Sequence, residues 1–84
     1  MPLPKEPVTL TVEQVGELNG KLSAMRHDIN NQLSLIVAAV ELIRHKPQTT
    51  DRMMTTLVEQ PPRIAETIQK FSAEFERTLG VLRD

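Results

Sequence analysis

The sequence predicts an all-α protein, an antiparallel hairpin of two long helices that dimerises into a four-helix bundle. Three observations predict this fold class. Apolar residues recur at spacings of three and four along two long segments, which is the pattern of helix seams. A short turn that contains a proline separates the segments, and short connections favour antiparallel neighbours. The 84 residues are 39% hydrophobic but only 2% aromatic, so aliphatic side chains must fill the core.

Composition excludes several functional classes. A chain of this length holds one domain, and its formal charge of −1 does not provide the basic patch of a nucleic-acid-binding protein. The absence of cysteine excludes a disulfide framework, a thiolate nucleophile and a cysteine-ligated metal. The three glycines, Gly16, Gly20 and Gly80, cannot form a phosphate cradle. We therefore expect no complete nucleotide-using enzyme in this chain.

Residues 1–10 contain three of the six prolines and are expected to form an extended lead-in. They lack the basic and then apolar pattern of a secretory signal. The longest mostly apolar stretch, residues 33–43, is much shorter than the roughly 20 residues that a membrane span needs. We expect a cytoplasmic protein without a membrane-spanning segment.

The first helix is expected over residues 11–46. Thr11 can serve as its N-cap, and Gln14 completes a capping box three residues later. Pro47 ends this helix, because proline disfavours helical geometry in the preceding residue and cannot donate a backbone hydrogen bond.

Heptad spacing defines the seam of this helix. A second stripe, formed by Leu33, Val37 and Val40, widens its apolar face, so the helix should contact more than one neighbour. One heptad position holds Val15, Leu22, Ile29, Ile36 and Ile43, and the other holds Leu18, Met25, Gln32 and Ala39.

The second helix is expected over residues 51–83, with Thr49 or Thr50 as its N-cap. Pro61 and Pro62 interrupt it, so either a kink or a restart is expected there. The apolar phase continues through the prolines, which favours a kinked but continuous helix. One heptad position holds Met54, Pro61, Ile68, Phe75 and Leu82, and the other holds Leu57, Ile64, Phe71 and Thr78. Residues 11–84 thus form one hairpin domain, and dimerisation is expected because two helices alone cannot bury such wide faces.

His27 lies on the polar side of the first helix. Met25 and Ile29 belong to the seam, so the histidine between them takes the outermost heptad position. Its neighbours one turn away are small and uncharged, and they leave a low surface that another protein can approach. Asp28 can accept a hydrogen bond from one ring nitrogen and leave the other nucleophilic. The neighbours are Ser23, Ala24, Asn30 and Asn31.

Residues 27–33, His-Asp-Ile-Asn-Asn-Gln-Leu, resemble the H-box of sensor histidine kinases. This box is the phosphoacceptor motif of their dimerisation and histidine-phosphotransfer (HisKA-like) domain. It comprises His, Glu or Asp, two variable residues, Asn or Thr, often Pro, and an apolar residue. Only Gln32 departs from it, at the proline position, which implies a straighter first helix. The layout of long helix, turn and long helix over residues 11–84 extends the resemblance.

The resemblance implies roles for three residues. His27 would accept a phosphoryl group on a ring nitrogen, and Asp28 would orient and activate it as a general base. Asn31 matches the position that holds a water for dephosphorylating the partner. One helical turn separates Asn31 from His27, which suits this role.

The resemblance also implies partners. These are a second copy of the chain, a response-regulator receiver domain with an acceptor aspartate, and an ATP-binding kinase domain in cis or in trans. The family's ATP-binding domain is absent from these 84 residues, so no autonomous kinase activity and no cofactor are expected in this chain.

Two other interpretations remain open at this point. The chain could be a non-catalytic helical adaptor that dimerises and docks a signalling partner, or a dimerisation segment in which His27 is incidental. Gln32 could set the bundle register, as a buried amide can. His45 is best explained as a cation at a helix C-terminus. Two separated histidines without nearby carboxylates at ligand spacing predict no metal site.

Overall fold

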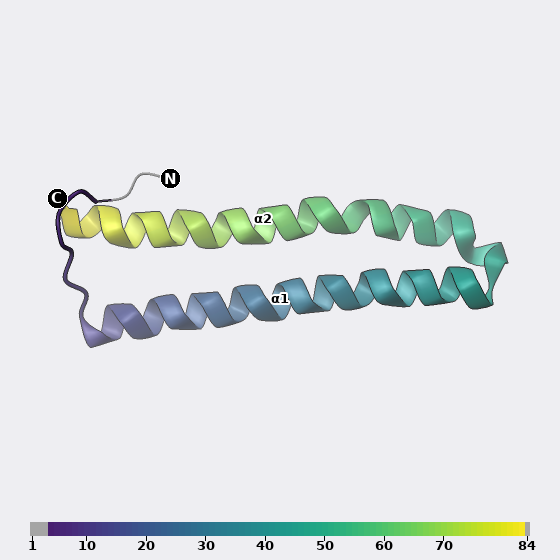
Figure 1. Cartoon of the computed structure of the whole chain (residues 1–84), viewed down its shortest axis with the longest axis horizontal. Coiled ribbons are helices and arrows are strands. Elements are labelled where there is room, and N and C mark those ends of the chain that lie inside the picture. Colours follow the sequence, from purple (N-terminus) through teal and green to yellow (C-terminus); the bar gives the residue numbers. More distant parts are fainter. Residues whose placement is uncertain (1–3, 84) are drawn as a thin grey trace.

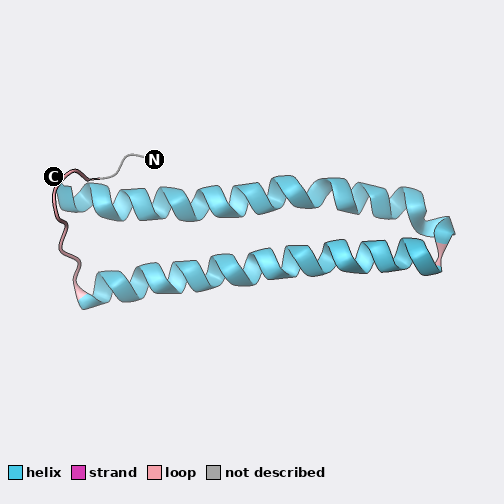
Figure 2. Cartoon of the chain, in the orientation of Figure 1, coloured by secondary structure: helices cyan, strands magenta, loops and turns pink. Residues whose placement is uncertain are grey.

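The computed structural model describes residues 4–83, with the side chains of residues 81–83 excepted. Helix α1 (Val12–His45) leads through the short 3-10 helix η1 (Pro47–Thr49) into helix α2 (Thr50–Arg83), which runs back alongside α1 (Figure 1). The described residues form helices and connecting segments without a strand (Figure 2). The molecule measures 57 × 22 × 13 Å, the shape of a single layer of two helices. The prediction of an all-α antiparallel hairpin is therefore confirmed.

The ends of α1 follow from local sequence. The Gln14 N–H donates to Thr11 Oγ1 over 3.1 Å, and the Thr11 N–H donates to Gln14 Oε1 over 2.8 Å. This is the predicted capping box, which satisfies two backbone donors that the first helical turn cannot pair. At the other end the Lys46 N–H donates to the Leu42 carbonyl over 2.7 Å, directly before Pro47.

The two threonines that were expected to cap α2 act differently. Thr49 lies in η1, and its hydroxyl donates to the Lys46 carbonyl over 2.7 Å. Thr50 already has helical dihedral angles, and its hydroxyl donates to the Pro47 carbonyl over 2.6 Å. Both hydroxyls therefore stabilise the tight turn by binding carbonyls behind them. The N-cap role was predicted from residue type, which does not determine the direction of these bonds.

Both Pro61 and Pro62 lie inside α2, which continues through them as one helix. The continuous helix rather than a restart is therefore confirmed. Since proline has no N–H, the carbonyls of Leu57 and Val58, four residues earlier, lose their usual helical donors. Helix α2 therefore lacks two of its own backbone hydrogen bonds about one third of the way along it.

The seam of α1 is close to the predicted one. The seam residues from Leu18 to Ile43 are buried or half-buried, and Ala39 is only 2% exposed. Val15 is the exception, with 52% of its surface exposed. Figure 1 shows the two helices further apart at this end of the hairpin than at the turn.

The prediction of the α2 seam is correct for one heptad position and wrong for the other. Leu57, Ile64, Phe71 and Thr78 are half-buried, as predicted. Met54 and Ile68 were expected in the seam, yet they are 48% and 46% exposed, and Pro61 is exposed as well. Phe75 is half-buried, and the Leu82 side chain lies outside the described residues. The residues that face α1 in their place come one position earlier: Met53, Gln60, Thr67 and Glu74.

The reason for this error is the width of the apolar stripe on α2. Periodicity locates the stripe on the helix, but it does not say which edge of the stripe faces the first neighbour. In the hairpin α2 presents its more polar edge to α1, and much of the apolar edge stays exposed.

Six exposed apolar side chains form what we call the apolar face of the hairpin. Val37 lies nine residues from Asp28, and Met54 lies nine residues from Arg63, which is about half a turn round each helix. Because Asp28 and Arg63 line the same cleft, the apolar side chains project from the opposite face of the layer. They are 42–69% exposed and comprise Leu33, Val37, Val40, Met54, Val58 and Ile68.

Two polar contacts between the described parts of the helices show the register of the hairpin. Lys21 Nζ lies 3.2 Å from Glu74 Oε2, and Gln32 Nε2 donates to Thr67 Oγ1 over 3.3 Å. Within one hairpin Gln32 thus bonds Thr67 of α2, and its expected role in the register of the bundle stays a prediction. Over the described part of the chain, neither helix has a stretch with the length and apolarity required for crossing a bilayer.

Candidate functional site

His27 lies on the side of α1 that faces away from α2. Met25 and Ile29, two residues before and after it, are half-buried in the seam, whereas 77% of the His27 side chain is exposed. A helix turns by about 100° per residue, so a position two residues from the seam on both sides must point outward. The predicted outermost placement of the histidine is confirmed.

Asp28 does not make the hydrogen bond that was expected. Its Oδ1 lies 4.0 Å from His27 Nδ1, which is beyond hydrogen-bond distance. Successive side chains leave a helix in directions about 100° apart, so Asp28 turns towards α2 while His27 points away from it. The Asp28 side chain is 61% exposed, and an ion pair at this distance in water is weak. The hydrogen bond was predicted because the two residues are adjacent in sequence. The helix directs their side chains to different sides, which keeps the two atoms beyond hydrogen-bond distance.

Asn31 follows His27 by four residues on the same helix. Side chains at this spacing leave the helix on the same side, one turn apart, and both residues are exposed. His27 and Asn31 therefore share one edge of the hairpin, and Asp28 lies between that edge and the cleft.

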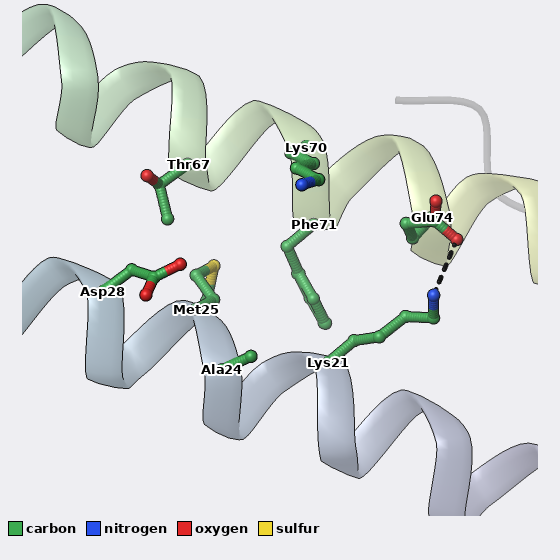
Figure 3. A pocket seen from close by; sticks show the side chains of 8 residues that line it. All are labelled: Lys21, Ala24, Met25, Asp28, Thr67, Lys70, Phe71 and Glu74. Atoms are coloured by element: carbon green, nitrogen blue, oxygen red, sulfur yellow. Dashed lines mark ion pairs between the residues drawn. The ribbon is translucent and has the colours of Figure 1, made fainter.

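A cleft of about 240 Å³ runs between the helices next to this edge (Figure 3). Ala24, Met25 and Phe71 form an apolar part of its wall. Figure 3 shows the Asp28 side chain at the rim of the cleft, with its carboxylate pointing along α1 towards Met25. The side chains that line it are Lys21, Ala24, Met25 and Asp28 from α1, and Thr67, Lys70, Phe71 and Glu74 from α2.

Charged side chains surround the cleft, and we call this side of the layer the charged face. Glu74 binds Lys21 over 3.2 Å and also pairs with Arg77 on its own helix. The hydrogen bonds from Lys21 and, to a lesser degree, Arg77 lower the pKa of the Glu74 carboxyl below its ordinary value. A second hollow, which Asp28 shares with Arg63 and Lys70, continues the charged face towards the turn.

The contribution of α2 to this region was missed from the sequence. Thr67 and Lys70 line both hollows next to Asp28, although they lie about forty residues away along the chain. The hairpin register could have predicted these neighbours, because the position of the turn determines which residues of α2 lie opposite Asp28. A reading that followed only apolar periodicity could not find polar partners across the seam.

His45 has a local structural role. Its Nε2 lies 3.1 Å from Glu41 Oε2, and Arg44 approaches the same carboxylate over 3.4 Å. This cluster occupies the last turns of α1, where positive charge is favourable. Within residues 4–83, no three acidic or histidine side chains gather as a metal site would require.

Comparisons with protein-family models, with curated proteins and with solved structures find no match to this chain. The chemistry of His27, Asp28, Asn31 and the cleft beside them is therefore the basis for a function.

Proposed function

We propose that this chain is a histidine-phosphotransfer and dimerisation domain of two-component signalling. His27 passes a phosphoryl group to or from the aspartate of a response-regulator receiver domain. The observation that carries the proposal is the placement of His27. It is an exposed imidazole at the outer edge of a long helix, with small side chains one turn away on each side, and Asp28 and Asn31 follow it in the order of the H-box.

The transfer itself needs little from this chain beyond a positioned nucleophile. A neutral ring nitrogen of His27 attacks phosphorus, the bond from phosphorus to the donor oxygen breaks, and the donor leaves as a carboxylate or as ADP. Such reactions depend mainly on positioning and on charge stabilisation, which the docked partner supplies. The kinase reaction requires an ATP-binding domain in cis or in trans.

Asp28 serves this reaction as the orienting group. Its carboxylate stands 4.0 Å from Nδ1 of His27 in the unbound chain. Catalytic hydrogen bonds are often long in unbound proteins and shorten in the reacting complex. Partner docking on the charged face would turn the exposed carboxylate from the cleft towards the imidazole. Asn31, one turn further along, would hold the water that dephosphorylates the partner.

Dimerisation uses the apolar face. Its six side chains form a set from both helices, which differs from the single exposed apolar residues found on most surfaces. A second copy offers the same face, and a two-fold axis would bring the two faces together as a four-helix bundle. This arrangement leaves the charged face and His27 on the outside of both subunits, open to a cytoplasmic signalling partner.

The alternative function is a non-catalytic helical adaptor. It would use the same dimer and the same charged face, with His27 as a contact residue only. The charged cleft favours docking in both cases, so the transfer chemistry distinguishes them.

The decisive experiment mixes the full chain with a panel of receiver domains that have been phosphorylated with acetyl phosphate. We expect the chain to acquire acid-labile, base-stable phosphate, and the His27→Gln variant to acquire none. His45→Gln is the matched control and should label normally, since His45 is also exposed but lies at the helix end. Label that survives His27→Gln would refute the assignment, and a chain that no receiver labels would be the adaptor.

A further inference from the structure

Helix α2 carries two candidate seams, and the hairpin uses the more polar one. Gln60 is 2% exposed, and although its Nε2 donates to the Thr56 carbonyl over 3.1 Å, its Oε1 is buried without a hydrogen-bond partner. The buried Oε1 of Gln32, on the facing helix, is also unpaired. A buried polar atom without a partner is destabilising, so this seam is not an optimal one for α2.

The second seam lies one residue further along. Met54, Pro61, Ile68 and Phe75 repeat at heptad spacing, and Met54 and Ile68 are about half exposed. The other heptad position, which includes Leu57 and Ile64, serves both seams. One residue corresponds to about 100° round the helix. Because only one of the two heptad positions differs between the seams, their centres lie about 50° apart.

Few polar contacts hold α2 in its present orientation. Among the described side chains, those across the seam are the Lys21–Glu74 pair, in which both side chains are about one-third exposed, and the Gln32–Thr67 hydrogen bond. Partly exposed pairs of this kind contribute little to stability. Pro61 and Pro62 remove two backbone donors from the middle of α2, which eases a local adjustment of the helix.

We infer that α2 has two packing orientations, related by a rotation of about 50° about its axis, and that a second copy of the chain selects the more apolar one. In that orientation Met54, Ile68 and Phe75 turn inward, and Gln60, Thr67 and Glu74 turn towards water. The unpaired Gln60 oxygen is then hydrated. This inference rests on the dimer of the proposed function but not on phosphotransfer.

The rotation would also couple dimerisation to the charged face. Thr67 and Lys70 line the cleft next to Asp28. Turning α2 brings Thr67 further into the cleft wall and carries Lys70 away from α1. The surface that a partner meets beside His27 therefore depends on whether the chain is dimeric.

The absence of cysteine allows a direct test with single thiols. Gln60→Cys, Ile64→Cys and Ile68→Cys are each labelled with a maleimide at chain concentrations below and above the dimerisation midpoint, which sedimentation measures for each variant. The thiol of Gln60→Cys should react slowly in the monomer and at least about tenfold faster in the dimer, because thiol reactivity follows exposure. The thiol of Ile68→Cys should react faster in the monomer than in the dimer. Ile64→Cys is the control for unfolding, since this position faces the seam in both orientations and its thiol should react slowly throughout.

Protection of the Ile68→Cys thiol alone would follow from any dimer that covers the apolar face, so the Gln60→Cys variant decides. If the chain dimerises and the thiol of Gln60→Cys stays protected, the rotation is wrong and the dimer stands. If the chain stays monomeric at every concentration, both fail. Thr67→Cys leaves Gln60 in place, and its thiol should respond in the same direction as that of Gln60→Cys. If circular dichroism shows that Gln60→Cys is less helical than the parent chain, Thr67→Cys takes its place in the experiment.

Discussion

The two faces of this hairpin have opposite chemistry although the same two helices form both. One face carries six exposed aliphatic side chains, three from each helix, among them Val37 and Ile68. The other face has a cleft between cations and carboxylates, with Asp28 on its rim and His27 on the adjoining edge. A single layer of two helices has little interior, so most of its side chains reach one of the two faces. Its two faces can therefore serve two partners.

The largest expected effect comes from breaking the apolar face. In Ile68→Asp a carboxylate would be buried in the interface of the proposed dimer, and an unpaired buried charge is strongly unfavourable. We expect the dimer dissociation constant to rise by about 100-fold or more, as measured by sedimentation equilibrium. Lys70→Asp makes the same kind of change on the charged face and should leave the constant within about threefold. Equal losses for both variants would mean that the two faces do not have separate roles.

The next effect concerns the charged side. Asp28→Asn keeps the shape of the side chain but removes the carboxylate that we propose orients His27, and a general base typically contributes 10²–10⁴-fold. If the proposed function holds, phosphoryl transfer should slow by about 100-fold, as measured by transfer rates from a phosphorylated receiver, with dimerisation unchanged. Asp51→Asn, on an exposed residue at the start of α2, is the control. A normal rate in Asp28→Asn would remove the proposed role of this carboxylate.

A third test compares the seam with the surface. Ala39 is 2% exposed, and the register seen in the Lys21–Glu74 and Gln32–Thr67 contacts places it opposite the equally buried Gln60. A larger side chain there has no space, so Ala39→Leu should lower the free energy of unfolding by about 1–3 kcal/mol in urea titrations. Ala38→Leu, on the exposed neighbour, should change it by less than about 0.5 kcal/mol. Similar values for the two variants would contradict this register.

The smallest effect is the pH dependence that Glu74 contributes. Lys21 and Arg77 lower its pKa in the folded chain, so the unfolded chain binds this proton more readily. The stabilisation is complete above the ordinary value of 4.5 and is lost as the pH falls through the lower folded-state pKa. Glu74→Gln should therefore flatten the fall in thermal stability between neutral and acid pH, whereas Glu17→Gln should not. An unchanged acid profile would show that the Lys21–Glu74 pair contributes nothing measurable.

Local features of this chain follow closely from local sequence. The Thr11–Gln14 capping box, the end of α1 before Pro47 and the exposure of His27 all depend on residues within one or two turns of helix. Helical periodicity and capping chemistry act over this range, so reading the sequence was sufficient for them.

Features that depend on direction were predicted less well. The Asp28 hydrogen bond to His27 was inferred from adjacency, and the helix turns the two side chains apart. The same applies to α2. Its apolar stripe was located correctly, but the edge of the stripe that faces α1 was not predicted. Thr67 and Lys70 beside Asp28 were not found at all, since polar residues give no periodic signal.

The sequence by itself determined that this protein is a helical hairpin and where the first helix begins and ends. It also determined that His27 is exposed on the outer edge. These properties come from backbone hydrogen bonding and from the spacing of side chains along one helix. Only the tertiary structure decided which side of α2 faces α1, and therefore that Gln60 is buried while Ile68 is exposed. The rotation of one helix against another depends on the summed packing of both surfaces. When an apolar stripe is wider than one neighbour can cover, several rotations satisfy the same pattern.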